Sequence, residues 1–209
     1  AYGAVLAAMR GDAAVASLAL PVVSQLRASE DQQDQAIVYL LRAFTEAASG
    51  QLSDVMRDAQ ELVDRIESLG IGAETVRWAW PLAVRTAFEL ADAEAVTRLI
   101  SVVDAFPRGH LPPILRAERD LASARLRVGS GDRAAGELVR EAIDELRAVG
   151  SPYHLAWGLL DLAEYSIDVG AAEVASDAIA EAREIATRLR VQPILDRAHQ
   201  LAAGAAIAA

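Results

Sequence analysis

The sequence predicts an all-α protein: an α-solenoid of about five antiparallel helix pairs, followed by a capping helix at the C-terminal end. Composition is the first indication, because 53% of the residues are hydrophobic, many of them alanine, and only 5% are aromatic, as in helical proteins. The second is the segment 151–190, which divides at Gly170 into two amphipathic helices. The third is repetition, since Gly11 and Gly50 are 39 residues apart, as are Gly131 and Gly170. A helix pair recurring with a period near 40 indicates a repeat array, because one pair cannot bury its apolar face alone. A compact helical bundle is the alternative.

Five pairs of helices and one final helix follow from the apolar periodicity and the turn residues. The expected helices are Ala1–Arg10 and Ala13–Arg27, Asp31–Ser49 and Asp54–Leu69, Ala73–Leu90 and Asp92–Phe106, Ile114–Val128 and Arg133–Val149, Pro152–Val169 and Ala171–Arg190, and then Ile194–Ala208. They group into one helical-repeat domain with units of about 1–28, 31–69, 73–106, 112–149 and 152–190 and a cap over 193–208.

Turn and capping residues refine these boundaries. Ser53, Asp132 and Ser151 stand where an N-cap is expected, because their side-chain oxygens can accept a hydrogen bond from a free N–H of the first helical turn. Pro21 and Pro81 fall inside expected helices and predict a bend or break at each position.

Charge and residue usage exclude several functions. All 20 basic residues are arginine, there is no lysine or cysteine, and the net charge is −10. A Walker-type phosphate loop, Schiff-base chemistry, thiol catalysis, disulfides and cysteine-ligated zinc are therefore excluded. The acidic balance argues against direct contact with nucleic acid, and no apolar run has the length of a membrane span. We expect a cytoplasmic location, no cofactor, and a chain that is a fragment of a longer protein, because Ala1 already looks like the middle of a helix.

A candidate groove is expected on the first helices of the pairs, which line the inner surface of such arrays. Arginines of units two to four form a basic row that fits an acidic or C-terminal carboxylate peptide, and acids of unit five form an acidic row. The aromatics fit a peptide or small ligand. Stacking of units four and five would pair Arg116 or Arg119 with Asp161. The candidate groove comprises Arg42, Trp78, Arg85, Arg116, Arg119, His154, Trp157, Asp161, Glu164, Tyr165 and Asp168. The alternatives are core packing for the aromatics and a solvated face with weak ion pairs for the charges.

No catalytic or metal site is expected. Asp196 and His199 share one helix face, but a metal needs more ligands than these two. The many carboxylates come without an evident nucleophile or base, and no Ser-His-Asp order is recognisable.

The last two units carry a resemblance to a known repeat. Leu162-Ala163 fall at a Leu-Gly position and Gly170 at an inter-helix turn, and the second helices show a small–bulky–small pattern at Ala175, Ile179 and Ala182 and at Ala135, Val139 and Ala142. In these features the chain resembles a degenerate tetratricopeptide repeat. It departs from that repeat in its period near 40 rather than 34, in Ser166 where a tyrosine is typical, and in its second and third units, which match poorly.

The closing residues, 150–201, resemble the C-terminal repeat region of large bacterial regulators that join an AAA-type ATPase to a nucleotide cyclase or a LuxR-type DNA-binding domain. This resemblance implies a signalling context and brings no catalytic residue with it. The expected function is a non-catalytic interaction or sensor scaffold that binds a peptide, a protein, a small ligand or other domains of its own parent chain. A structural spacer or homo-oligomerisation module, here a homodimer, is the first alternative, and a helical-bundle enzyme the second.

Overall fold

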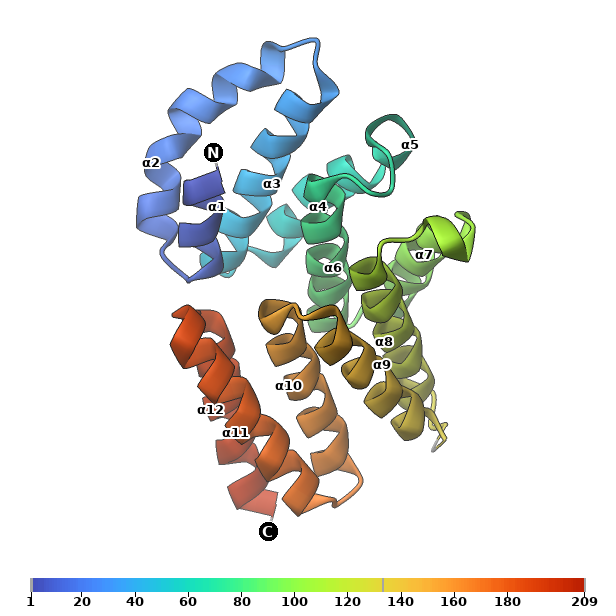
Figure 1. Cartoon of the computed structure of the whole chain (residues 1–209). Coiled ribbons are helices and arrows are strands. Elements are labelled where there is room, and N and C mark those ends of the chain that lie inside the picture. Colours follow the sequence, from blue (N-terminus) through green and yellow to red (C-terminus); the bar gives the residue numbers. More distant parts are fainter. Residues whose placement is uncertain (1, 133, 209) are drawn as a thin grey trace. The chain divides into compact units, whose positions relative to one another are not determined.

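The computed structural model describes residues 2–132 and 134–208, and within them every regular element is a helix (Figure 1). The predicted all-α class is therefore confirmed. The chain forms two compact units, with the boundary between Leu115 and Arg116. No helix in the described part of the chain is both long and apolar enough to cross a membrane.

Unit 1 begins with α1 (Tyr2–Met9), α2 (Ala13–Val23) and the 3₁₀ helix η1 (Ser24–Ala28), followed by α3 (Gln32–Ala48), α4 (Leu52–Val63) and α5 (Ile66–Leu69). It continues through α6 (Glu74–Glu89), α7 (Ala93–Asp104) and η2 (Arg108–His110). The helix α8 (Pro113–Gly129) begins just before the boundary and lies mostly in unit 2, which also holds α9 (Ala135–Val149), α10 (Pro152–Asp168), α11 (Ala172–Leu189) and α12 (Gln192–Ala208).

Helices pack in serial order within each unit. In unit 1, α1 contacts α3 and α3 contacts α6, so that each first helix lies beside the next first helix, while α2 and α4 contact the first helix that follows them. In unit 2, α10 contacts α9, α11 and α12. This order is that of helical repeats, because each pair buries the apolar face of its neighbour. The final helix α12 contacts both α10 and α11, so it occupies the place of a further first helix, as expected for a cap.

The first helices α8 and α10 run in the same direction. Glu118 contacts His154, a side chain added at Gly158 would meet Leu121, and Arg125 contacts Asp161. In each contact the two partners are 36 or 37 positions apart. This near-constant offset shows that the two helices lie side by side in a fixed register. The offset is two or three residues smaller than the 39-residue spacing of the turn glycines.

The five turns within the helix pairs share one conformation. The turn residues Gly11, Gly50, Ala91, Gly131 and Gly170 are left-handed, with φ between 55° and 87°. In every turn the following N–H donates to the carbonyl five positions earlier, as Asp12 N–H does to Ala7 O and Asp92 N–H to Ala87 O, both at 2.9 Å. This is the Schellman closure of a helix, and it confirms the predicted turns.

Capping residues follow these turns directly. Asp12 and Asp92 accept hydrogen bonds from the backbone N–H groups of Val15 and Ala95. Asp132 accepts one from Ala134 N–H at 2.9 Å, but α9 begins at Ala135 with Ala134 as its N-cap, so Asp132 does not hold the N-cap position that the sequence predicts.

The prediction for Ser53 is wrong, because α4 begins at Leu52 with Gln51 as its N-cap. The Schellman turn at Gly50 places the helix start two residues after the glycine, so Ser53 lies inside α4. Ser151 does stand at the N-cap of α10, but its hydroxyl makes no capping hydrogen bond.

One helix is divided at a place that the sequence did not predict, and the two expected proline sites differ from each other. The helix expected over 54–69 is divided at Asp64 and Arg65 into α4 and α5, and at the division the Arg65 guanidinium stacks 4.9 Å from the Tyr39 ring. Near Pro21, α2 continues two residues further and passes into η1. Pro81 lies buried inside α6, which runs unbroken through it.

Candidate functional site

A buried acid–histidine pair joins α8 to α10 in unit 2. His154 Nδ1 lies 2.5 Å from Glu118 Oε1, and the two side chains are 3% and 5% exposed. The Tyr153 ring meets the imidazole edge to face, with centroids 5.5 Å apart. The placement of His154 on a groove is therefore wrong. Because α8 covers that side of α10, a polar residue there needs a partner within the protein, and Glu118 supplies it.

The acidic residues of α10 are paired with arginines of neighbouring helices. Asp161 Oδ1 lies 2.9 Å from Arg125 Nη1. Glu164 Oε1 lies 2.6 Å from Arg197 Nη2 of α12, and its other oxygen is 4.0 Å from Arg125. Asp168, at the end of α10, is exposed. These contacts connect α8, α10 and α12 along one side of unit 2.

Asp161 pairs with Arg125, whereas the sequence predicted Arg116 or Arg119 as its partner. Arg116 Nε lies 3.8 Å from Glu145 of α9, and Arg119 Nη1 lies 2.6 Å from its neighbour Asp120. The register of the parallel helices explains the difference, because Arg125 is level with Asp161.

Two aromatic side chains of α10 have different roles. Tyr165 packs against α9, since a Cβ added at Gly136 would lie 2.1 Å from the Tyr165 hydroxyl oxygen. For Tyr165 the structure thus favours the core-packing interpretation. Trp157 is half-buried, one helical turn after the half-buried Tyr153 and one turn before Asp161. Tyr153, Trp157 and Glu164 therefore share the partly exposed face of α10.

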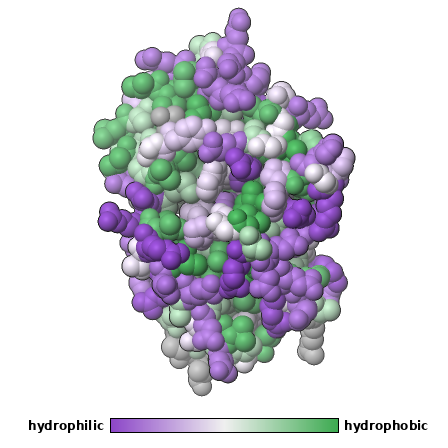
Figure 2. All heavy atoms as spheres, in the orientation of Figure 1, coloured by the Kyte–Doolittle hydropathy of each residue, from purple (hydrophilic) through white to green (hydrophobic). Residues whose placement is uncertain are grey.

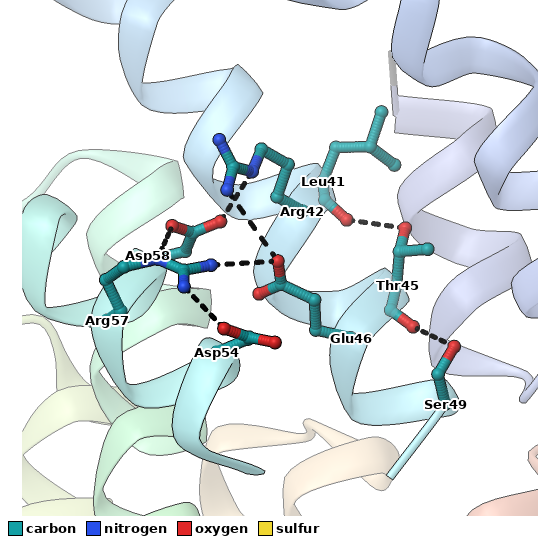
Figure 3. Close-up of polar contacts among 8 residues, drawn as sticks. All are labelled: Leu41, Arg42, Thr45, Glu46, Ser49, Asp54, Arg57 and Asp58. Carbon is teal, nitrogen blue, oxygen red and sulfur yellow. Dashed lines mark hydrogen bonds and ion pairs between the residues drawn. The ribbon is translucent and has the colours of Figure 1, made fainter. Parts of the chain in front are cut away.

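The remaining candidates lie in unit 1. Arg85 of α6 is buried, with 9% exposure, and Trp78 is half-buried on the same helix. Arg42 of α3 belongs to a charged cluster with residues of α4, drawn in Figure 3. Its Nε lies 2.6 Å from Asp58 Oδ2, and Asp58 is 2% exposed. A buried carboxylate of this kind is retained only with a close cation, so Arg42 acts first to hold α3 against α4.

Glu46 and Arg57 complete this cluster. Arg57 contacts Asp54, lies 3.2 Å from Asp58 on its own helix, and reaches across to Glu46 Oε1 at 3.4 Å (Figure 3). Burial, and then the charge of Asp58, raise the pKa of Glu46 to about 7, although Arg42 and Arg57 act in the opposite direction. Glu46 therefore holds a proton up to near-neutral pH, whereas an ordinary glutamate is ionised.

Several of these residues were not among the sequence candidates. Glu46 pairs with Arg57 across the consecutive helices α3 and α4, as Arg42 does with Asp58. Glu118 and Arg125 join α8 to α10, about 36 positions further along the chain. In both cases the partners lie on different helices, so no spacing within one helix reveals the pairing. Only the pairs on one helix, such as Arg57 with Asp54 three positions earlier, are visible in the sequence as helical neighbours.

Among the described residues, no three histidine or carboxylate side chains are grouped so as to hold a metal ion. The chain matches no protein-family model and no curated protein.

Proposed function

We propose that this chain is a protein-interaction or sensor scaffold that binds a peptide segment on one face of unit 2. This face, called the α8–α10 face below, consists of Arg119 and Ser123 of α8 and Tyr153, Trp157 and Glu164 of α10. All five residues are half-buried. The partner is a segment of another protein or of another domain of the same parent chain.

The observation that carries the proposal is the parallel alignment of α8 and α10. A buried contact of Glu118 with His154 and a partly buried ion pair of Arg125 with Asp161 hold these helices together. The face is therefore rigid before a ligand arrives, and rigid surfaces lose less entropy on binding. Because these charges join helices to one another, they support a scaffold role rather than a reaction.

The chemistry of the face indicates what it would recognise. Trp157 is half-buried, with its Nε1 inside the protein, so it offers part of its apolar ring surface. Tryptophan and arginine are common anchors of interfaces. Arg119 carries a guanidinium that contacts Asp120 at 2.6 Å, and a ligand carboxylate would compete with Asp120 for it. A peptide with an apolar side chain beside an acidic group or a C-terminal carboxylate fits this pair. The resemblance of residues 150–201 to the C-terminal repeat region of bacterial signalling regulators supports a regulatory setting.

Selection of peptides from a displayed random library against the full chain tests the proposal. We expect enriched peptides to bind in fluorescence anisotropy with micromolar affinity, and Trp157→Ala and Arg119→Ala each to weaken binding at least about tenfold, or about 1.4 kcal/mol. The matched control is Arg140→Ala on α9, an exposed arginine paired with Glu137, which should change the affinity less than twofold. Circular dichroism checks that each variant folds. No enrichment over a library without target, or binding unaffected by both variants, would refute the proposal.

A further inference from the structure

The helices α1 and α2 differ from all others in the described part of the chain, because neither carries a charged side chain. They nevertheless expose large apolar side chains. Leu6 is 52% exposed, Val15 49%, Leu18 78% and Val22 68%. Figure 2 shows apolar atoms gathered at the upper left, where Figure 1 draws these helices.

The exposed side chains of α2 lie on one face of the helix. Val15, Leu18 and Val22 follow the three- and four-residue spacing of neighbours on one side of a helix, while Ala16 and Val23 on the other side are buried. Tyr2 is also half-exposed, but burial and the neighbouring Glu74 raise the pKa of its phenol, which places its hydroxyl near α6. The apolar surface therefore centres on α2, with Leu6 of α1 beside it.

From this surface we infer that the chain forms a two-fold symmetric dimer in which the α2 helix of one copy packs antiparallel against the α2 helix of a second copy. A two-fold interface brings the same patch together with itself. An uncharged patch meets no like-charge repulsion in that arrangement, although the chain as a whole has a net charge of −10. Apart from α1, every other helix in the described part of the chain carries at least one charged side chain.

The charges at the two ends of α2 favour the antiparallel direction. Asp12 caps the start of α2, and Arg27 follows its end in η1. If two copies cross near Leu18, Asp12 of each copy lies opposite Ser24 of the other, and Arg27 follows one turn later in η1, near enough for its long side chain to approach Asp12. A parallel arrangement would instead place acid beside acid and base beside base.

The size of the patch sets the expected strength of the dimer. Four large side chains with about half to four-fifths of their surface exposed make a patch on the order of 400 Å². Typical interfaces take about 800 Å² from each partner, and weak ones less. The neighbouring alanines of α1 and α2 enlarge the contact only modestly. We therefore expect a weak dimer that appears within the micromolar range of concentration.

Sedimentation equilibrium of the full chain over about 1 to 500 µM tests the inference, a range chosen for a contact of this size. The wild type should pass from monomer to dimer with rising concentration. The double variant L18E/V22E should weaken the dimer at least about 100-fold. The control Val174→Glu changes a valine of α11 that is 39% exposed, and it should leave the dimer intact. A wild type that stays monomeric, as it would if the face serves a different protein or a lipid surface, overturns the inference, as does a dimer that is unchanged in L18E/V22E.

Cross-linking tests the same geometry without adding charge. The chain has no cysteine, so Leu18→Cys introduces a single thiol at the expected crossing point, and Ser176→Cys introduces one on an exposed position of α11. Mild oxidation should convert the Leu18→Cys protein to a disulfide-linked dimer at least tenfold faster than the Ser176→Cys protein. Equal rates for the two variants would exclude α2 as the contact.

Discussion

Ala91 is the position where a single substitution should stabilise this protein. It occupies the left-handed residue of the turn between α6 and α7, with φ of 55°, and its side chain is exposed. The equivalent residue in the other four pairs is glycine. The turn is closed in the usual way, since Ala91 N–H donates to Phe88 O at 3.0 Å and Asp92 N–H to Ala87 O at 2.9 Å. Ala91→Gly keeps both hydrogen bonds, because they use only the backbone.

Two opposing terms give the magnitude. A residue with a Cβ costs about 1–2 kcal/mol in the left-handed conformation, and glycine removes that cost. Glycine also gains freedom in the unfolded chain, which costs about 0.5–1 kcal/mol on folding. The exposed methyl group of Ala91 contributes little burial. The expected net effect is a rise in the free energy of unfolding of about 0.5–1 kcal/mol.

Urea unfolding followed by circular dichroism measures this difference. The matched control is the reverse change, Gly50→Ala, at the same position of the α3–α4 turn, where φ is 72° and an added Cβ meets no atom within 4 Å. Its cost is therefore conformational, and we expect a loss of about 0.5–1 kcal/mol. If Ala91→Gly lowers the stability while Gly50→Ala leaves it unchanged, the left-handed strain assigned to these turns is refuted.

Three further predictions concern other residues. Ala171 stands at the N-cap of α11 with φ −88° and ψ 65°, close to the φ of −93° and ψ of 78° of the capping residue Asp92. An aspartate side chain at this position can cap α11, so Ala171→Asp should stabilise the protein by about 0.5–1.5 kcal/mol in thermal unfolding. An unchanged melting temperature would contradict this prediction. Because the pKa of Glu46 is raised to about 7, the folded chain binds more protons than the unfolded chain between about pH 4.5 and 7, and stability contributed by this residue falls as pH rises through that window. Glu46→Gln should therefore gain stability relative to wild type between pH 5 and 8 in urea unfolding, and a constant difference would argue against the shift. In Gly158→Ala the new Cβ would lie 2.7 Å from Ile143 and 3.0 Å from Leu146. The overpacking should cost about 1–3 kcal/mol of unfolding free energy, which outweighs the gain of about 1 kcal/mol from helix propensity, so the variant should be less stable than the wild type. Gly204→Ala in α12 meets no atom within 4 Å and should stabilise instead; destabilisation by both changes would refute the packing argument.

Local patterns were sufficient for the helices and their turns. The left-handed glycines at 11, 50, 131 and 170 and the Ala91 turn were all predictable, because a helix end depends on residues within one or two turns of the chain. The error at Ser53 was also local, because α2, α7 and α11 each begin two residues after the left-handed turn residue, as α4 does after Gly50.

The sequence by itself thus determined the helical class, the pairing of helices and the position of each turn, because these follow from backbone conformation and short-range periodicity. Tertiary structure decided which face of each helix is covered. The polar stripe of α10 does not reveal that His154 is buried against Glu118, or that Asp161 meets Arg125 instead of Arg116 or Arg119. Each residue turns a helix by about 100°, so a shift of one or two positions in the register between neighbouring helices changes every partner. That register is set by packing along the whole length of both helices.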